Sequence, residues 1–427
     1  METENHSLLS ITACRLCGAP LGEPVLSLGN QPISNRLATS QQEDATLRTY
    51  PLSIVLCSAC GLPQLEHNLQ ASDHFHGDYV YLSGASSTWV QHCSEYAQDL
   101  VQHQGLCEGD FIIETGSNDG TLLKAFSALG LRTLGIEPSS NVADLARKDG
   151  IETLATFFNE AAATLIRKKH GVPKALVGNN VLAHVPDTDA FLRAARDLID
   201  PEGFLCFEFP HFVHILDRRY FDTIYHEHYT YLGVGPLQKW ADNNGMELYD
   251  VERHSTHGGS LRVFLRHQGA RARFQKHSSM IDAIIADETA LKGAEPWHQL
   301  ARWLEQWRER LRSSLADFTA EGKKVVGYAA ASKATVLCNY LGVTVDDIAY
   351  CCDASPTKQH RIIPGTGIPI VEPERIRKEP PDVVMVFAWN IFDEILSRIS
   401  KLVTRPTTVI QPLPDIKIVS VHVGEQE

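Results

Sequence analysis

The sequence predicts a mixed α/β protein with a doubly wound, Rossmann-like core, and two stretches of the chain support this fold class. Residues 111–114 form a short apolar strand that runs into a glycine turn at 115–120, which a helical pattern and a second strand ending in Glu137 follow. Another strand and turn, at 324–333, opens a similar pattern in the C-terminal part. With 427 residues the chain is long for one hydrophobic core, so we expect two or three domains.

The composition is that of an ordinary globular protein, with 43% hydrophobic and 21% charged residues. A net charge of −13 argues against non-specific binding to nucleic acid. No window approaches the ~20 consecutive apolar residues of a membrane span, and the N-terminus has no basic stretch that leads into an apolar run. We therefore expect a cytoplasmic protein, a monomer or small homo-oligomer without nucleic-acid or membrane partners, whose ten cysteines stay reduced.

Two CxxC-Gly motifs stand near the N-terminus, and their four cysteines are candidate metal ligands: Cys14, Cys17, Cys57 and Cys60. In each motif the chain turns tightly enough for two thiolates to reach one ion, and the following glycine permits the positive φ that the turn requires. Four sulfur ligands in a reducing compartment select tetrahedral zinc and leave no position open for a substrate. We expect a structural Zn²⁺ site, with a loop or hairpin filling the 39 residues between the motifs. A redox role for the motifs is the competing interpretation.

The turn after the first central strand decides which cofactor the core binds. It contains Gly116 and Gly120 with Ser-Asn-Asp between them, not the G-x-G-x-x-G that admits a dinucleotide pyrophosphate. Acids before and inside the turn would repel phosphate but suit the ammonium and sulfonium of S-adenosylmethionine, and Glu137 would accept the ribose hydroxyls. An aromatic ring at Phe157 or Phe158 would pack on adenine, with plain core packing as the alternative. The expected cofactor-binding residues are Glu114, Gly116, Asn118, Asp119, Gly120, Glu137, Phe158 and Asn179.

Residues 221–231 read Phe-Asp-Thr-Ile-Tyr-His-Glu-His-Tyr-Thr-Tyr. Polar residues occupy both odd and even positions of this segment, so a strand would carry them on both of its faces. Burying so many polar groups for packing alone would cost several kcal/mol unless each were paired. A crowded set of proton donors and acceptors is what acid–base chemistry needs, so this segment is the predicted catalytic centre. A hydrogen-bonded loop that is rich in aromatics is the alternative. A second tyrosine-rich stretch, 74–83, reads as a linker or as a flap over the pocket.

The C-terminal part carries residues suited to a nucleotide diphosphate. Ser332 and Lys333 open a helix after a small-residue turn, which is a good phosphate seat. A basic and polar stretch at 356–361 and a strand at 382–390 that ends in an indole and an amide add further candidates. We expect substrate contacts from Lys333, Lys358, Arg361, Trp389 and Asn390. A degenerate duplicated domain with a structural role is the alternative, and residues 270–320 read as a connecting helix between domains.

The chain contains, in this order, CRLCG, CSACG, ETGSNDG, GIEPSS, FDTIYHEHYTYL, HGGSLRVF, GYAAASKAT and FAWN. Together these motifs resemble the sugar C-methyltransferases of deoxysugar biosynthesis, which methylate nucleotide-linked 4-keto sugars on the way to branched sugars such as mycarose and tetronitrose. The resemblance covers essentially the whole chain, so it is more specific than any single motif.

The resemblance implies a zinc-binding domain at 1–70, an S-adenosylmethionine-dependent methyltransferase domain at 71–270, and a Rossmann-like α/β domain at 271–427 that helps to bind the nucleotide sugar. The nucleotide is expected to be dTDP. In the implied reaction a base removes a proton from the carbon beside the keto group, and the enolate attacks the methyl sulfonium. The residues that match family positions are His228 as general base, Tyr225, Glu227 and Tyr79 beside it, and His184 in the pocket lining.

One departure from the family pattern concerns the substrate. After Tyr231 the chain reads Leu-Gly-Val-Gly where family members more often have Phe-Ser, so we expect an altered pocket rim. The nearest competing function is O- or N-methylation of a similar sugar, in which no carbon-bound hydrogen would exchange with solvent. An NAD-dependent oxidoreductase would need the missing dinucleotide fingerprint, and a zinc-containing binding protein that has lost activity is the competing class.

Overall fold

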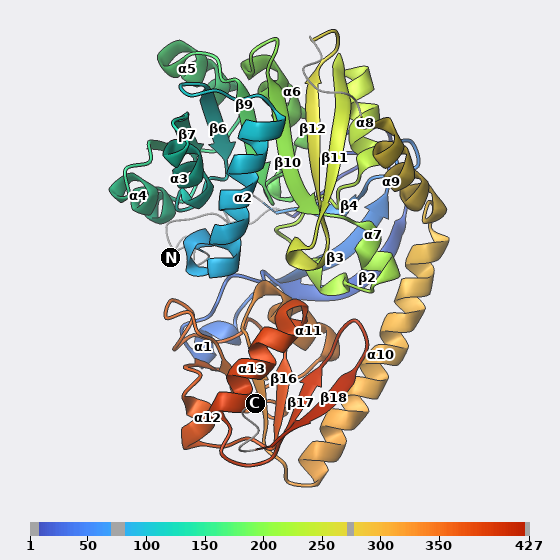
Figure 1. Ribbon diagram of the computed structural model, residues 1–427. Coiled ribbons are helices and arrows are strands. Elements are labelled where there is room, and N and C mark those ends of the chain that lie inside the picture. Colours follow the sequence, from blue (N-terminus) through green and yellow to red (C-terminus); the bar gives the residue numbers. More distant parts are fainter. Residues whose placement is uncertain (1–7, 70–81, 271–276, 423–427) are drawn as a thin grey trace.

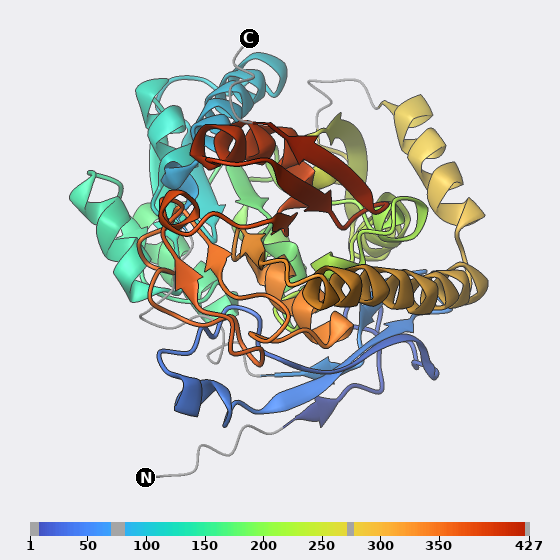
Figure 2. The same cartoon turned by 90° about the horizontal axis from the view of Figure 1, so that it is seen from below.

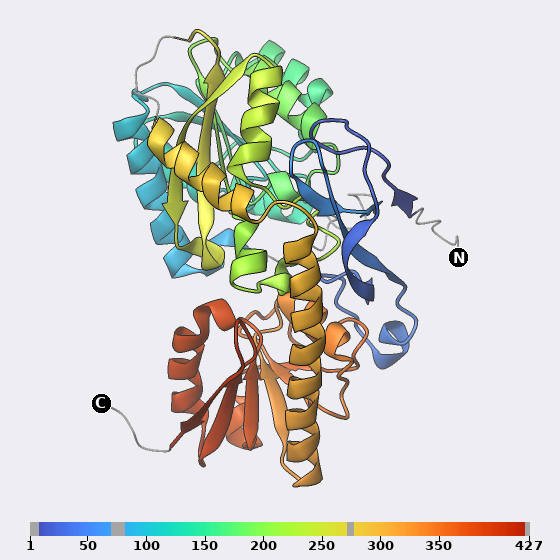
Figure 3. The ribbon, with the colours of Figure 1, turned by 90° about the vertical axis from the view of Figure 1, so that its right-hand side faces the viewer.

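The computed structural model describes residues 8–69, 82–270 and 277–422. Two α/β units lie one above the other in Figure 1, and the N-terminal strands run along one side of the junction between them, as Figure 3 also shows. This arrangement confirms the predicted α/β class with a Rossmann-like core, a small N-terminal module and a second α/β unit at the C-terminal end.

The N-terminal module, residues 8–69, consists of short strands and one short helix. Its elements are β1 (Leu9–Ser10), β2 (Pro24–Pro32), α1 (Gln41–Asp44), β3 (Thr49–Leu56), β4 (Pro63–Leu65) and β5 (His67–Asn68). β2, β3 and β4 form an antiparallel sheet in that order, and β1 pairs with β5. The β2–β3 hairpin fills the interval between the two cysteine motifs, as the spacing predicts.

The central unit is built on a seven-stranded sheet with helices on both faces (Figure 1). Its strands are β6 (Phe111–Thr115), β7 (Arg132–Ile136), β8 (Thr153–Leu154), β9 (Ala175–Asn179), β10 (Phe204–Pro210), β11 (Met246–His254) and β12 (Ser260–His267). The order is β11-β12-β10-β9-β6-β7-β8; the strands from β10 to β8 are parallel, and β12 is antiparallel to both of its neighbours. The winding direction reverses between β6 and β9, and doubly wound sheets bind their ligands at the carboxyl ends of the strands at such a switch point.

Seven helices belong to the described part of the central unit. They are α2 (Ser87–His103), α3 (Thr121–Ala128), α4 (Ser140–Lys148), α5 (Glu160–His170), α6 (Thr188–Leu198), α7 (Val213–Asp217) and α8 (Val234–Asn243). Three of them, α2, α5 and α6, begin at a capping side chain. The Asn159 side chain accepts from the third residue of α5 and the Asp187 side chain from the third residue of α6, each at 3.0 Å. Short 3₁₀ turns connect the larger elements at η2 (Ser83–Ala85), η3 (Leu182–His184), η4 (Phe221–Thr223) and η5 (Thr256–Gly258).

The C-terminal unit repeats the doubly wound arrangement. Its strands are β13 (Val325–Tyr328), β14 (Cys351–Cys352), β15 (Ile370–Val371), β16 (Val383–Val386), β17 (Thr407–Gln411) and β18 (Lys417–Val421). Its helices are α11 (Ser332–Leu341), α12 (Arg375–Lys378), η6 (Trp389–Ile391) and α13 (Phe392–Leu402). The strand order is β15-β14-β13-β16-β17-β18, with β18 antiparallel, so the switch point of this sheet lies between β13 and β16.

Two helices join the units: α9 (Ser278–Ala290) and α10 (Glu295–Ala320). Figure 2 shows α10 lying along the N-terminal strands, and its side chains Trp297 and Trp307 are fully buried. The same hydrophobic core contains Leu28 of the N-terminal module and Val383 of the C-terminal unit. The predicted connecting helix therefore packs between the parts of the chain, and in the described residues no helix is both long and apolar enough to traverse a bilayer.

Candidate active site and metal centre

A cavity of about 960 Å³ lies where the three parts of the chain meet. Its walls come from the carboxyl ends of β6 and β9, from the segment 223–228, and from the loops that follow β13, β14 and β16. Asn35 of the N-terminal module also lines it. The two switch points therefore open into one space, which is large enough for a cofactor and a substrate together.

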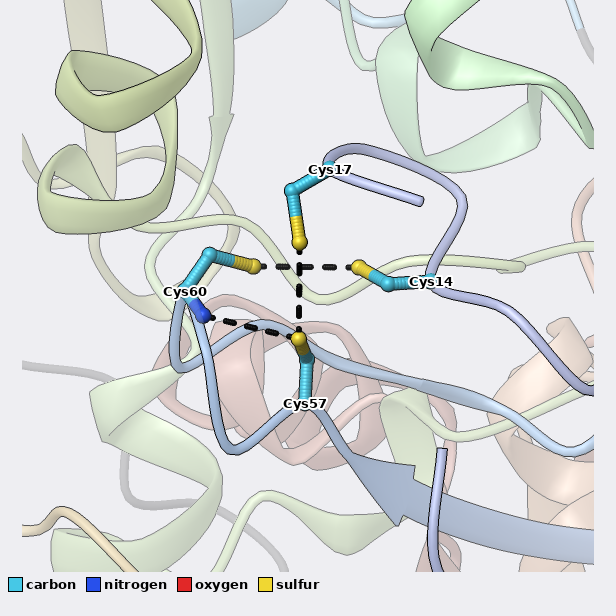
Figure 4. A group of neighbouring side chains, drawn as sticks. All are labelled: Cys14, Cys17, Cys57 and Cys60. Atoms are coloured by element: carbon cyan, nitrogen blue, oxygen red, sulfur yellow. Dashed lines mark hydrogen bonds between the residues drawn. The ribbon is translucent and has the colours of Figure 1, made fainter. Parts of the chain in front are cut away.

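The four N-terminal cysteines converge on one point (Figure 4). Their Sγ atoms all lie within 4.8 Å of one another, with Cys14 and Cys60 at 3.7 Å and Cys17 and Cys57 at 3.6 Å. A tetrahedron of sulfurs around zinc has edges of roughly 3.8 Å, so the cluster fits Zn²⁺ as it stands. None of these cysteines lines the cavity. Zinc is therefore a structural ion in this protein, and four thiolates close its coordination sphere.

The glycine after each cysteine motif has the conformation that the sequence predicts. Gly18 has φ +68° and Gly61 has φ +84°. In each turn the glycine N–H donates to the carbonyl of the first cysteine, at 2.9 Å and 2.8 Å. A side chain at either position would strain the turn that brings the two thiolates together.

The carboxyl ends of β7 and β9 form the cofactor half of the cavity. The oxygens of Glu137 accept from the backbone N–H groups of Asn118 at 3.0 Å and Ser139 at 2.8 Å. Burial raises the pKa of this carboxyl, and the same N–H groups oppose the rise. The amide of Asn179 has buried polar atoms with no hydrogen-bond partner among the described residues, and it lines the cavity. The Glu137 carboxylate has further lone pairs that can accept hydrogen bonds, and the Asn179 amide can both donate and accept. These groups fit the ribose and amino-acid parts of S-adenosylmethionine.

The predicted cofactor residues divide between the cavity wall and the support behind it. Those that line the cavity are Gly116, Asn118, Glu137, Phe158 and Asn179. Glu114 lies behind the turn, where burial and then the charges of Asp119 and Glu137 raise its pKa well above the usual range. Asp119 accepts from the Thr121 hydroxyl at 2.6 Å and from the Gly84 N–H at 2.8 Å, so its carboxylate holds η2 against the turn. Asp119 and Gly120 do not line the cavity, in contrast to the predicted acidic seat for the sulfonium.

Two phenylalanines stand at the edge of this half. Phe158 packs edge-on against Phe191, with ring centroids 5.1 Å apart. Its neighbour Phe157 is 41% exposed and also lines the cavity. Both rings of the predicted pair therefore line the cavity, and that of Phe157 is the more exposed.

The imidazole of His228 is held at both nitrogens. Nδ1 lies 2.8 Å from the carbonyl oxygen of Thr223, which accepts hydrogen bonds and does not donate, so Nδ1 carries the proton. Nε2 therefore presents its lone pair, and the hydroxyl of Tyr225 donates to it at 2.8 Å. Both side chains line the cavity. A neutral imidazole in a fixed tautomer is the form of histidine that accepts a proton.

The ring of His184 lies edge-on to that of His228, with centroids 4.7 Å apart. Burial lowers the pKa of His184 to about 4, against the effect of a hydrogen bond to the backbone of Glu227. His184 is therefore neutral near pH 7, and it adds no positive charge that would disfavour protonation of His228. It lines the cavity, where the family resemblance puts it.

Glu227 lies between His228 and the N-terminal module. The amide nitrogen of Asn35 donates to both of its oxygens, at 2.8 Å and 2.9 Å. Burial raises the pKa of Glu227 to about 7, and the side chain and backbone of Asn35 oppose this rise. The hydroxyl of Ser332, the first residue of α11, donates to Asn35 Oδ1 at 2.7 Å. A row of hydrogen bonds therefore runs from α11 through the N-terminal module to the catalytic segment.

Lys333 brings a positive charge to the part of the cavity that the C-terminal unit lines. Its Nζ lies 4.0 Å from Asp222 Oδ1 and 4.2 Å from the centroid of the Trp389 ring, and it has no hydrogen-bond partner among the described residues. Burial lowers the pKa of Lys333, and the charge of Asp222 opposes this. No side chain caps the N-terminus of α11, which begins one residue earlier. An ammonium with unused donors beside an uncapped helix N-terminus fits a phosphate group.

The other predicted substrate residues lie at different depths. Lys358 and Asn390 line the cavity, whereas Arg361 and Trp389 do not. Trp389 donates from Nε1 to Asp222 Oδ2 at 2.6 Å while its ring faces Lys333, so it positions that pair. Tyr79, the predicted flap residue, lies outside the described residues.

The N-terminal module holds the catalytic segment along its length. The N–H of Leu65 donates to the carbonyl of Tyr229, and the N–H of Tyr231 donates to that of Pro63, both at 2.9 Å. His226 Nε2 lies 3.2 Å from a carbonyl oxygen at the start of β3. β4 directly follows the second cysteine motif, so the metal site fixes the strand that pairs with residues 229–231.

The Leu-Gly-Val-Gly stretch after Tyr231 does not line the cavity, so the prediction of an altered pocket rim is wrong. The N–H groups of Val234 and Gly235 donate to the Glu288 carboxylate at 2.6 Å and 2.8 Å. A Cβ on Gly233 would come within 2.7 Å of the same carboxylate. The glycines therefore make room for a buried acid that caps the N-terminus of α8.

Three family models match successive parts of the chain. They are described as "Putative zinc binding domain" over residues 14–75, "Methyltransferase domain" over 90–251 and "C-methyltransferase C-terminal domain" over 255–414. The first contains the four cysteines, the second the cofactor half of the cavity, and the third the loops with Lys333 and Asn390.

Comparison with individual proteins agrees with these models. The chain is 30% identical over 412 residues to C-methyltransferase NovU of Streptomyces niveus, which covers 96% of this chain and 97% of that protein. A ubiquinone biosynthesis O-methyltransferase of Shewanella halifaxensis (strain HAW-EB4) is 25% identical over 101 residues, or 23% of this chain and 43% of that protein. Magnesium protoporphyrin IX methyltransferase (ChlM) of Synechocystis PCC 6803 with bound SAM aligns at 16% identity with a TM-score of 0.32, over 42% of this chain and 79% of that one. The match to NovU along nearly all of both chains shows that this protein belongs to the C-methyltransferase family and is an S-adenosylmethionine-dependent methyltransferase.

Proposed function

We propose that this enzyme methylates a carbon beside the ketone of a nucleotide-linked 4-keto-deoxysugar, with dTDP as the nucleotide. One observation carries the proposal: the imidazole of His228, which donates to the Thr223 carbonyl from Nδ1, and a cation with unused donors, Lys333, line the same cavity. The imidazole supplies the base that an α-proton requires, and the cation suits a diphosphate. Similarity to a C-methyltransferase over the whole chain supports carbon as the methyl acceptor.

His228 takes the proton through Tyr225. The Tyr225 hydroxyl already donates to Nε2, so its oxygen accepts the proton from the substrate carbon as its own proton passes to the imidazole. The electrons of the broken C–H bond move toward the ketone oxygen and form an enolate. The Thr223 carbonyl, 2.8 Å from Nδ1, stabilises the imidazolium. S-adenosylmethionine, held by Gly116, Asn118, Glu137 and Asn179, would supply an electrophilic methyl group to the nucleophilic carbon and would leave as S-adenosylhomocysteine, which keeps the electrons of the broken methyl–sulfur bond.

The three parts of the chain divide the work in this proposal. Residues 71–270 bind the cofactor and carry the proton-transfer groups. Residues 271–427 hold the nucleotide diphosphate through Lys333 and Lys358, both of which line the cavity. Residues 1–70 hold zinc and position the catalytic segment through β4.

Proton exchange without methyl transfer tests the proposal. The enzyme is incubated in deuterium oxide with S-adenosylhomocysteine and a dTDP-4-keto-6-deoxysugar, and deuterium is followed by NMR. We expect enzyme-dependent exchange at one carbon beside the ketone, reduced ~10²-fold or more in both His228→Gln and Tyr225→Phe. His103→Gln, at the exposed end of α2, is the matched control and should exchange normally.

Each other outcome has a definite meaning. Exchange near the wild-type rate in Tyr225→Phe, with loss in His228→Gln, would show that the imidazole takes the proton directly. Exchange that persists in His228→Gln would remove His228 from the role of base. No exchange with a series of keto sugars would favour methylation of oxygen or nitrogen.

A further inference from the structure

We infer that Asn35 is a positioning residue of the active site: its amide holds the Glu227 carboxyl in place and favours its ionised form, and takes its own orientation from Ser332. The inference rests on the proposed function in one respect, which is that ionised Glu227 then accepts a hydrogen bond from a hydroxyl of the sugar. Asn35 acts through Glu227 and takes no part in bond making.

The contacts of the Asn35 side chain determine which way the amide faces. A carboxylate only accepts hydrogen bonds, so the two short contacts to Glu227, at 2.8 Å and 2.9 Å, require the NH₂ group. Oδ1 then faces Ser332, whose hydroxyl donates to it at 2.7 Å. A reversed amide would set its oxygen against the carboxylate and lose all three contacts.

The loop that carries Asn35 is docked on α11 by a second hydrogen bond. The hydroxyl of Thr335, one turn after Ser332, donates to the Ser34 carbonyl at 3.0 Å, and Thr335 and Ser34 are both buried. The N-terminal module, the catalytic segment and α11 therefore meet at one amide. Lys333 lies next to Ser332 at the N-terminus of α11, the proposed phosphate site. The Asn35 side chain therefore links this phosphate site to Glu227.

The charge of Glu227 depends on this amide. Burial favours the neutral acid and the Asn35 hydrogen bonds favour the carboxylate, which together leave the pKa at about 7. In the described part of the chain, the hydrogen bonds to its carboxylate come from Asn35. Other titratable groups that line the same cavity are Tyr225 and His228 on its own segment, His184 in η3, Lys333 in α11, Lys358 after β14, Glu137 after β7, Glu160 in α5, Asp187 before α6, and Arg193, Arg196 and Asp197 in α6.

The experiment measures the ionisation of Glu227 directly and needs no substrate. Protein labelled with carbon-13 at the glutamate side-chain carboxyl is titrated by NMR, and the Glu227 signal is assigned by its loss in Glu227→Gln. We expect the midpoint to rise by about one pH unit in Asn35→Ala and by more in Asn35→Asp, which opposes two carboxylates. Asn30→Ala, at an exposed position of β2, is the matched control and should leave the midpoint unchanged.

A smaller upward shift is expected in Ser332→Ala, which frees the amide to turn without altering the N-terminal module. This variant decides the question if Asn35→Ala fails to fold. An unchanged midpoint in the folded variants would overturn the inference, because an amide that merely packs would lower activity without moving the titration.

Activity provides an independent second measurement. The acid limb of the pH profile for proton exchange or methyl transfer should shift upward in Asn35→Ala by the same amount as the NMR midpoint. A shifted NMR midpoint without any activity on keto sugars would leave the inference standing and refute the proposed substrate. An unshifted acid limb beside normal activity would overturn the role of Asn35.

Discussion

Glu227 is a residue whose environment makes the stability of the fold depend on pH. Burial raises its pKa to about 7 in the folded protein, whereas an unfolded chain has a glutamate pKa near ~4.3. The folded state therefore binds the proton more tightly than the unfolded state. This contribution to stability is fully present below pH ~4.3 and is lost as the pH rises through the folded pKa.

Replacing Glu227 by glutamine should reveal this dependence. Relative to the wild type, we expect Glu227→Gln to gain about 1–3 kcal/mol more stability at pH 8 than at pH 5, since the amide never carries the buried charge. Urea unfolding at both pH values measures the difference. Glu95→Gln, an exposed change on α2, controls for charge alone. Equal changes at the two pH values would show that the Glu227 pKa is not raised.

At the scale of elements, the parts that the sequence predicts well are those with a local pattern. β6 and β7 are apolar runs that end in a turn or an acid, and each appears where it was expected. Among the strands that pattern did not reveal are β15, with two residues, and the edge pair β17 and β18. Short and edge strands exist because a neighbour offers its backbone groups, and no local signal carries that information.

The residues of the site were also predictable only where the sequence carries a local signal. The segment 221–231 was found because polar groups crowd it, and the cysteines because their spacing is local, whereas the roles of His228, Tyr225 and Glu227 came from the family resemblance. Asn35 was missed, since 192 positions separate it from Glu227 and its own loop has no distinctive composition. Asp119 was predicted to bind the cofactor because a sequence does not distinguish a ligand-facing acid from one that holds a neighbouring turn, as Asp119 does through Gly84.

Because β4 pairs with the catalytic segment, the metal site should affect the rate of methyl transfer. We expect loss of zinc, by chelation or in Cys60→Ser, to reduce methyl transfer at least ~10-fold, because the strand that holds residues 229–231 is then no longer fixed. Affinity for S-adenosylhomocysteine, measured by calorimetry, should change much less, since the cofactor half belongs to the central sheet. Cys107→Ser, at an exposed thiol, is the control. Equal loss of rate and cofactor affinity would instead indicate general unfolding.

For the whole molecule, the organising feature is that two doubly wound sheets direct their switch points into one cavity. The first contributes the ends of β6 and β9, and the second the loops after β13 and β16. Each sheet supplies the kind of site that its topology favours, and the distance between the two sites is set by α10 and the shared core. In the proposed function, cofactor and nucleotide would bind to different sheets, with the chemistry between them.

If cofactor and nucleotide bind to different sheets, a substitution in the C-terminal unit should weaken binding of the nucleotide sugar and leave binding of the cofactor unchanged. We expect Lys333→Met to raise KM for the nucleotide sugar about 10²-fold, as one hydrogen bond to a charged group contributes about 1.5–3 kcal/mol. kcat should change less, and binding of S-adenosylhomocysteine should stay as in the wild type. Steady-state kinetics and calorimetry measure the three quantities, with Lys323→Met at an exposed position as the control. A fall in kcat at unchanged KM would move Lys333 from substrate binding to the chemical step.

The pairing between β4 and the catalytic segment also bears on how the chain folds as it leaves the ribosome. Gln64 of β4 and its bridge partner Thr230 are 166 positions apart, so their synthesis is separated by roughly 10–30 s. During that interval the edge of a small sheet has no partner, and such edges associate with other chains. Zinc, whose four ligands are all made by residue 60, gives the early segment a defined shape while translation continues. The metal thus protects a nascent folding unit until the strand that completes it has been made.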